Sequence, residues 1–136
     1  SVCRGLEALA AEEPRYVLIH DGARPWVSSR LIERVLEATR RFDACIPVLE
    51  ASEAPKIVDP ASGRIVQDLD RSRLFFAQTP QGFLFRSILE AHRRARSDGM
   101  RCVDDAEVYA RYCGPVHSVA GDPRNRKITY PEDLEA

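Results

Sequence analysis

Basic side chains are concentrated in one short segment near the end of the chain. Residues 121–129, with the sequence Gly-Asp-Pro-Arg-Asn-Arg-Lys-Ile-Thr, place two arginines and Lys127 in a single turn. A flexible lysine in such a turn is a good point charge for a phosphate group. A solvated basic loop is the alternative interpretation. We expect a strand at 127–130 and a helix that begins at Pro131 to follow this turn.

Two further segments place polar groups beside apolar, strand-like runs. One is His20-Asp21-Gly22-Ala23-Arg24-Pro25, and the other is Gln78-Thr79-Pro80-Gln81, which we expect to lead into a helix. Ligands of open α/β sheets bind at the carboxyl ends of strands. Asp21 offers the carboxylate oxygen that Mg²⁺ favours, and Gly22 lets the backbone approach a ligand. Arg24 suits a phosphate or a supporting ion pair, whereas a loop with Asp21 on backbone amides and Arg24 at the surface is the alternative.

Other polar residues have simpler interpretations. We expect His20 to be a buried, hydrogen-bonded side chain rather than a base. Arg71 has the fork geometry that suits a phosphate, although an isolated arginine is more often a surface residue. Asp104 and Asp105 resemble a metal pair, but two acids at a helix N-terminus are already explained by the helix dipole, and we prefer that structural role.

The composition excludes several functional classes. The chain has 136 residues, of which 44% are apolar and 30% charged, and this predicts one globular domain. A net charge of -1 provides no basic field for nucleic acid, and the apolar runs are far shorter than the ~20 residues that span a bilayer. No cysteine spacing indicates a metal site or a disulfide framework. We therefore expect reduced thiols in a cytoplasmic protein.

Strand and helix signals alternate along the chain, which predicts an α/β layered fold. The apolar run 16–19 is typical of a strand buried on both faces of a parallel sheet. Residues 56–58 and 64–67 predict a hairpin with a five-residue loop and too few apolar residues for its own core, so we expect it to pack on something such as a second subunit. The remaining predictions are strands at 44–49 (despite Pro47), 74–77 and 116–119, and helices at 2–11, 28–42, 83–96 and 104–112.

Glycine-rich phosphate loops are missing from the chain. A doubly wound nucleotide-binding fold normally opens with a strand and such a loop, whereas here the first predicted element is a helix. Either phosphates are held differently, or the first third of the domain is absent from this chain. We therefore describe residues 1–136 as a single incomplete domain.

Taken together, these segments resemble the 2-C-methyl-D-erythritol 4-phosphate cytidylyltransferases of the non-mevalonate isoprenoid pathway. The resemblance covers essentially the whole chain and rests on Ser1-Val2, Gly5-Leu6, His20 to Pro25, Pro47-Val48, Asp70-Arg71, Gln78 to Gln81, Asp104-Asp105-Ala106, Gly121 to Thr129 and Pro131 to Leu134. It implies an enzyme that joins CTP and methylerythritol phosphate into a CDP-alcohol and releases pyrophosphate with the help of Mg²⁺. It also implies a Rossmann-like nucleotidyltransferase sheet with helices on both faces. Finally, it implies a homodimer in which a β-arm, about residues 50–72 here, reaches over the partner's active site.

Individual residues acquire roles from the same resemblance. Lys127 matches the lysine that positions the sugar phosphate, and Arg71 matches the arginine that does so from the partner's arm. Asp21 matches the acid near the magnesium and the ribose. Gly22 matches a ribose-contacting backbone position, and Ser1 a serine beside the cytosine.

Several positions depart from the family pattern. The glycine-rich start with its basic triphosphate-binding residues is missing, Ala54 stands where the arm usually carries a threonine, and Val103 replaces the threonine before Asp104. We therefore expect this chain alone to be inactive. Two alternatives stay open: a cytidylyltransferase for ribitol 5-phosphate, against which Gly22-Ala23 argues, and a non-catalytic dimerisation or binding domain.

Overall fold

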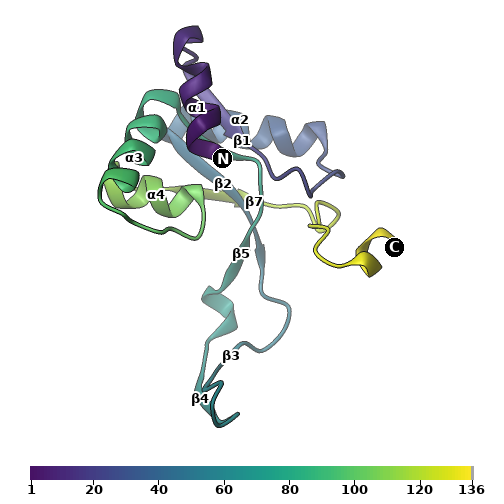
Figure 1. Ribbon diagram of the computed structural model, residues 1–136. Coiled ribbons are helices and arrows are strands. Elements are labelled where there is room, and N and C mark those ends of the chain that lie inside the picture. Colours follow the sequence, from purple (N-terminus) through teal and green to yellow (C-terminus); the bar gives the residue numbers. More distant parts are fainter. Residues whose placement is uncertain (136) are drawn as a thin grey trace.

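Helices and strands alternate through the computed structural model, which describes residues 1–135 (Figure 1). None of the helices within these residues is long and apolar enough to cross a bilayer. In chain order the elements are α1 (Val2–Leu9), the 3₁₀ helix η1 (Ala10–Glu12), β1 (Tyr16–Ile19), α2 (Ser29–Phe42), β2 (Ala44–Glu50), β3 (Lys56–Val58), β4 (Ile65–Asp68), the 3₁₀ helix η2 (Arg71–Arg73), β5 (Phe75–Ala77), β6 (Gln81–Leu84), α3 (Phe85–Ser97), α4 (Asp105–Tyr112), β7 (His117–Ala120) and the 3₁₀ helix η3 (Pro131–Leu134).

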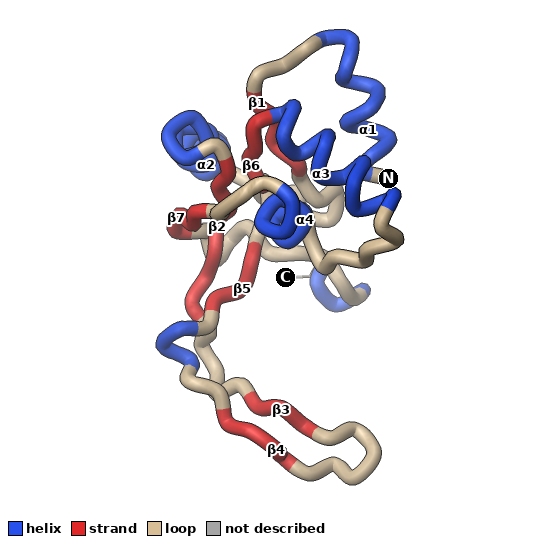
Figure 2. The backbone as a smooth tube through the Cα atoms, turned by 90° about the vertical axis from the view of Figure 1, so that its left-hand side faces the viewer, coloured by secondary structure: helices blue, strands red, loops and turns tan. Residues whose placement is uncertain are grey.

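The centre of the fold is a five-stranded mixed sheet. Its strand order is β1-β6-β2-β5 with antiparallel neighbours, and β7 pairs with β2 in the parallel sense. Helix α2 covers one face, and α1, α3 and α4 cover the other (Figure 2). The predicted α/β class with helices on both faces of a sheet is therefore confirmed.

Strand β1 does not have the environment that its apolar run predicted. It pairs antiparallel with β6, from Tyr16 opposite Leu84 to Ile19 opposite Gln81, and it is the first strand in the order of the described sheet. All four of its residues are half-buried. The expectation of a strand buried within a parallel sheet was wrong, because a continuous apolar run does not reveal which neighbours a strand will have.

Strand β2 is the inner strand that residues 44–49 predicted, and Pro47 fits within it. The first part of β2 pairs with β6 and the last part with β5, so Pro47 stands where the partner changes. A proline lacks the N–H of a regular ladder and is tolerated at such a break. The Pro47 carbonyl accepts a hydrogen bond from the Gln78 N–H at 2.8 Å. The break thus makes room for the polar loop that joins β5 to β6.

Strand β6 was missed from the sequence, where the polar loop was expected to lead directly into a helix. Helix α3 instead begins at Phe85, after β6 has crossed between β1 and β2. Phe83 at the centre of β6 is fully buried, and its ring centroid lies 5.4 Å from that of Tyr109 in α4. The main core therefore lies between the sheet and the face that carries α3 and α4.

Helix boundaries follow local capping signals. The Ser28 hydroxyl accepts a bond from the Leu31 N–H at 3.2 Å, and the Asp104 carboxylate accepts one from the Glu107 N–H at 2.9 Å. The structural role preferred for Asp104 is therefore confirmed. The strand expected at 127–130 is wrong, since no strand forms there, and η3 is a single 3₁₀ turn.

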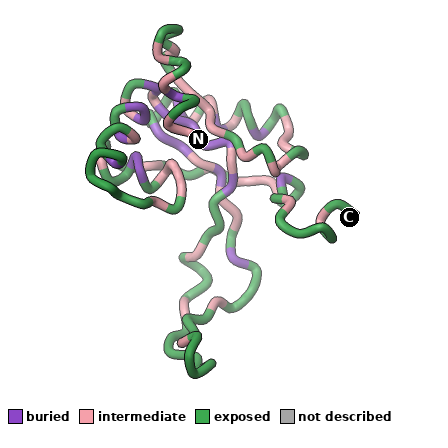
Figure 3. The backbone as a smooth tube through the Cα atoms, in the orientation of Figure 1, coloured by how far each residue is buried: buried purple, intermediate pink, exposed green. Residues whose placement is uncertain are grey.

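The predicted hairpin projects away from the sheet as a two-stranded arm (Figure 1). Every residue of β3 and β4 is exposed (Figure 3), including Ile57, Val58, Ile65 and Val66. The expectation that this hairpin lacks a core of its own is confirmed. An isolated hairpin is marginally stable in water, so the arm requires contacts beyond its own two strands. Its exposed apolar side chains are available for such contacts.

Replacing Gly82 with alanine will destabilise the fold, because helix α2 packs directly on the backbone of β6. A methyl group there would overlap the buried Thr39 hydroxyl and lie 2.9 Å from Leu18 Cδ2. We expect Gly82→Ala to lower the free energy of unfolding by about 1–3 kcal/mol in urea denaturation. Gly5→Ala in helix α1 is the matched control. Apart from the local backbone of the helix, no atom lies within 4 Å of a methyl group at Gly5, so stability should rise by about 0.5–1 kcal/mol. Equal unfolding midpoints for Gly82→Ala and the wild type would contradict this packing account.

Candidate functional site

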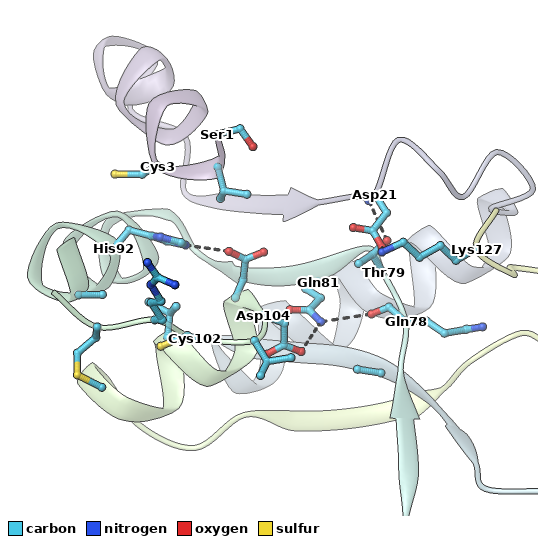
Figure 4. A pocket seen from close by; sticks show the side chains of 18 of the residues that line it. Ser1, Cys3, Asp21, Gln78, Thr79, Gln81, His92, Cys102, Asp104 and Lys127 are labelled. Atoms are coloured by element: carbon cyan, nitrogen blue, oxygen red, sulfur yellow. Dashed lines mark hydrogen bonds and ion pairs between the residues drawn. The ribbon is translucent and has the colours of Figure 1, made fainter. Parts of the chain in front are cut away.

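A cavity of about 990 Å³ opens at the carboxyl end of β1, beside the loops that follow β5 and β7. Ser1, Asp21, Arg24 and Lys127 all belong to its wall, so the structure brings four of the six predicted site residues together (Figure 4). Gly22 lies next to the wall, and a methyl group there would meet no protein atom within 4 Å. Packing within the protein therefore does not require a glycine at this position.

The loop after β1 is held by a chain of polar contacts. The Thr79 hydroxyl lies 2.9 Å from His20 Nδ1 and accepts a bond from the Asp21 N–H at 3.0 Å. His20 Nε2 lies 2.9 Å from the Arg24 carbonyl, which can only accept, so Nε2 carries the hydrogen and Nδ1 of a neutral ring accepts from Thr79. His20 is exposed, so the expectation of a buried side chain was wrong. Its expected hydrogen bonding is confirmed, and both ring nitrogens serve the loop.

Two cations converge on the carboxylate of Asp21. Its Oδ2 atom lies 3.2 Å from Arg24 Nε and 3.8 Å from Lys127 Nζ. Figure 4 shows the Lys127 side chain reaching toward Asp21. The Arg24 side chain is only 12% exposed and also donates from Nη1 to the Asn125 carbonyl at 2.8 Å. Arg24 therefore supports the site as an ion-paired brace. Lys127 is 51% exposed, so its ammonium remains accessible from the cavity.

Gln78 fastens the loop that precedes Lys127. The side chain is 4% exposed, and its amide nitrogen donates to the carbonyls of Asp122 at 2.9 Å and Asn125 at 3.1 Å. Its amide oxygen accepts from the Asp122 N–H at 3.0 Å. A methyl group on Gly121 would lie 2.5 Å from that same oxygen, so the close approach requires glycine. One buried amide thus satisfies three backbone groups of the basic turn.

Asn125 ties the two loops from the other side. It is fully buried, and its side-chain amide donates to the Thr79 carbonyl at 2.7 Å. Its Oδ1 atom has no partner within the described residues. Asp122 closes the turn, and the backbone N–H and guanidinium of Arg124 lower the pKa of the Asp122 carboxyl. The basic segment is therefore a braced turn, unlike the solvated loop of the alternative interpretation.

The opposite end of the cavity contains a histidine–carboxylate pair. His92 Nε2 lies 2.8 Å from Asp105 Oδ1, and both side chains are largely buried. Gln81 donates to the Asp104 carboxylate at 3.2 Å, between this pair and Lys127 (Figure 4). Within residues 1–135, no group of three or more His, Cys, Asp or Glu side chains is placed to hold a metal ion. The carboxylates of Asp104 and Asp105 thus bind other groups of the fold.

Arg71 lies on the arm, outside the cavity of its own chain. Its Nη1 donates to the Ser52 carbonyl at 3.0 Å, which links the two sides of the arm near its base. The Asp70 carboxylate accepts from the Ser72 hydroxyl at 2.7 Å and from the Ser72 N–H, and these bonds lower the pKa of Asp70. The turn that carries Arg71 is therefore ordered even though it projects from the sheet.

Comparison with known proteins agrees with the fold and the cavity. The family model of IspD, 2-C-methyl-D-erythritol 4-phosphate cytidylyltransferase, matches residues 1–136. The chain belongs to this family. The family resemblance and the Rossmann-like nucleotidyltransferase class expected from the sequence are confirmed by this match and by the similar structures below.

Both curated and solved members of the IspD family are similar to the chain. The bifunctional enzyme IspD/IspF of Bradyrhizobium diazoefficiens is 48% identical over 135 residues, which cover 98% of this chain and 34% of that protein. The crystal structure of 2-C-methyl-D-erythritol 4-phosphate cytidylyltransferase from Thermus thermophilus has a TM-score of 0.89 and 38% identity, over 99% of this chain and 64% of that one. The bifunctional IspDF of Campylobacter jejuni has a TM-score of 0.81 at 25% identity, over 99% of this chain and 33% of that one. The chain thus spans about a third of the curated relatives' length.

Sequence reasoning found the IspD-type charged residues but missed the amides that place them. Gln78 and Asn125 were noted within their segments, without a structural role. The sequence predicts Thr79 only as part of a helix start, whereas its hydroxyl contacts both the His20 ring and the Asp21 N–H. A polar loop that follows an apolar strand and contains an X-Pro bond was the available signal.

Substituting Gln78 with leucine will loosen the basic turn of this IspD-family chain. The Asp122 N–H loses its partner, and the carbonyls of Asp122 and Asn125 each lose one of two hydrogen bonds. Burying such groups without a hydrogen bond costs about 1–3 kcal/mol. We expect Gln78→Leu to lower the free energy of unfolding by that amount, and to accelerate amide exchange at Asp122, whose N–H binds the glutamine oxygen. Gln67→Leu is the control, since Gln67 is exposed on the arm. Unchanged exchange at Asp122 would show that Gln78 does not hold the turn.

Proposed function

We propose that the protein transfers a cytidylyl group from CTP to 2-C-methyl-D-erythritol 4-phosphate, giving the CDP-alcohol and pyrophosphate. The observation that carries the proposal is the convergence of Lys127 and Arg24 on Asp21 at the carboxyl end of β1, in a chain of the IspD family. In α/β sheets this edge is where ligands bind. Two cations around one carboxylate leave a positive charge that suits phosphate groups.

The chemistry requires two anions to meet. A phosphate oxygen of the sugar phosphate attacks the α-phosphorus of CTP, a new P–O bond forms, and the bond to the β-phosphate breaks with loss of pyrophosphate. A phosphate monoester has a second pKa of about 6 and is largely dianionic at neutral pH, so it needs no general base. The His92–Asp105 pair, at the other end of the cavity, is therefore not required for proton transfer (Figure 4).

Positioning and electrostatics supply the catalysis in this proposal. The Lys127 ammonium offsets the repulsion between the reactants and orients the sugar phosphate. Ser1 and Gly22 are assigned to the nucleotide side, beside the cytosine and the ribose. Because the turn that bears Lys127 is braced before substrate arrives, little reorganisation is needed at the moment of reaction.

A magnesium ion fits the donor set near Asp21. Mg²⁺ binds through one or two carboxylates and takes its other ligands from substrate phosphates and water. Asp21 offers one carboxylate, 37% exposed, at the cavity wall. When bound, the ion would add positive charge beside the triphosphate, and Asp21 would hold it.

We further propose that the site is completed by Arg71 from a second copy of the chain. The arm projects from the sheet, and its apolar residues are exposed, from 42% at Ile57 to 60% at Val66. A partner subunit would cover this surface and receive the arm over its cavity.

The cytoplasmic location and the description of residues 1–136 as one incomplete domain stay predictions.

A non-catalytic dimerisation or binding domain is the second candidate. Val103, at the cavity wall, is 96% exposed, and Ala54 in the arm has no hydroxyl. Both positions depart from the family pattern, and the hydroxyl missing at Ala54 removes a contact expected with the sugar phosphate, which favours the second candidate. Turnover assays of the intact protein with CTP and Mg²⁺ distinguish these candidates. Turnover of methylerythritol phosphate or of ribitol 5-phosphate identifies the substrate of an enzyme, and no turnover of either indicates a domain without activity.

Lys127→Ala should lower kcat/KM for the sugar phosphate about 100-fold, because losing one positioned charge costs roughly 3 kcal/mol in the transition state. Arg86→Ala is the control, since Arg86 is an 85% exposed cation paired with Glu13. We expect that control to keep wild-type kinetics. An unchanged kcat/KM in Lys127→Ala rules out its proposed role.

Mixed dimers test the contribution of Arg71. Arg71→Ala and Lys127→Ala homodimers should both be impaired, whereas a heterodimer of the two variants has one site with both residues intact. We expect the mixture to regain up to half of the wild-type activity per heterodimer, measured after subunit exchange. Activity that stays at the level of the parent variants would count against a site shared between subunits.

A further inference from the structure

Trp26 and Arg126 form a contact outside the cavity wall, between the two loops that bear Asp21 and Lys127. The Arg126 guanidinium carbon lies 4.8 Å from the centroid of the Trp26 ring. Neither residue belongs to the wall that contains Lys127. We call this contact the Trp26–Arg126 stack. It joins segments that are 100 residues apart in the chain.

Successive residues of the basic turn are held in different ways. Asn125 is fully buried and binds the Thr79 carbonyl, Arg126 lies over Trp26, and Lys127 reaches Asp21. Lys127 therefore has a fixed residue immediately before it, on the side away from the cavity. After it, the Ile128 N–H donates to the Ala23 carbonyl at 2.8 Å. The stack and this hydrogen bond join the same two loops on either side of Lys127.

Arg126 is also placed by charge. The backbone N–H groups of Tyr130 and Thr129, together with the Arg126 guanidinium, lower the pKa of the Asp133 carboxyl. The guanidinium thus lies near an anion as well as near an indole face. An indole is the aromatic ring that attracts cations most strongly, and the Trp26 ring, at 41% exposure, lies at the surface. The contact with Trp26 restricts Arg126, and with it the backbone that leads into Lys127.

We propose that the Trp26–Arg126 stack positions Lys127 for the sugar phosphate, a role that rests on the proposed function. Trp26 and Arg126 are positioning residues, because they act through the lysine and touch neither substrate. The stack keeps the basic turn against the Asp21 loop, so the lysine ammonium is already directed to the carboxylate when the phosphate enters. Loss of the stack lets the turn separate from that loop part of the time.

The test combines kinetics with amide exchange in the intact protein. Trp26→Leu removes the aromatic ring and Arg126→Met removes the charge, while each keeps an apolar side chain at its position. A cation–π contact at an exposed site corresponds to a change of about two- to fivefold in an equilibrium constant. We expect KM for the sugar phosphate and the exchange rate of the Ile128 amide to rise by that factor, with kcat near the wild-type value. Trp26→Phe and Arg126→Lys keep an aromatic ring and a cation, so the rise in KM and in the exchange rate should be smaller in these variants.

Arg15→Met is the matched control. Arg15 lies over the ring of Tyr16 at 5.4 Å, at the end of β1 opposite to the cavity. This variant removes the same kind of contact from a place that cannot move Lys127. We expect the same KM and Ile128 exchange rate as in the wild type.

Two results would overturn the positioning role. One is an unchanged Ile128 exchange rate with an unchanged KM in both Trp26→Leu and Arg126→Met. The other is an equal change in Arg15→Met, which would indicate general destabilisation. A wild-type protein that turns over no alcohol phosphate contradicts the proposed function instead, and the Ile128 exchange rate then decides by itself whether the stack holds the turn.

Discussion

The buried amides of Gln78 and Asn125 connect the loops that follow β5 and β7, and the position of Lys127 depends on them. Gln78 binds three backbone groups of the basic turn, and Asn125 binds the backbone at Thr79 in return. Buried backbone groups of a loop must find partners, since leaving them unpaired costs as much as a lost hydrogen bond. Side-chain amides meet this requirement without adding charge. The loops that carry the cations of the site are therefore held in place by hydrogen bonds to neutral side chains.

The sheet supplies the place where these loops can meet. Strand β2 changes partner from β6 to β5 at Pro47, and the Gln78 loop occupies the resulting gap. Strand β7, parallel to β2, delivers the basic turn to the same edge. The arm leaves the sheet at this edge as well, and it carries Arg71 away from the cavity of its own chain.

Local signals predicted much of this arrangement. Helix α2 follows from its apolar spacing and its Ser28 cap, and α4 follows from Asp104. Asp21 and Lys127 were found because charged residues beside glycines and prolines mark loops that can bind phosphate. The arm was predicted because two strand-like segments flank an evident turn and contain too few apolar residues to form a core of their own.

What escaped prediction depends on contacts between distant residues. Strand β6 has a polar, glycine-containing start, and it becomes a strand by pairing with β1 and β2. The partners of the Gln78 amide lie 44 and 47 residues further along the chain, so no local pattern announces its role. His20 was expected to be buried, but its ring is fixed at the surface by Thr79 and the Arg24 carbonyl. The Trp26–Arg126 stack likewise exists only once the loops have met.

Nuclear magnetic resonance of the Lys127 side chain tests the central claim most directly. The Lys127 ammonium signal is assigned by its loss in Lys127→Ala, and Lys56 is the other lysine of the 136 residues. The intact protein would be titrated with methylerythritol phosphate in the presence of a non-hydrolysable CTP analogue and Mg²⁺. The account predicts a saturable shift of the Lys127 signal, at lower apparent affinity in Gln78→Leu. A Lys127 signal that does not respond to the sugar phosphate would contradict it.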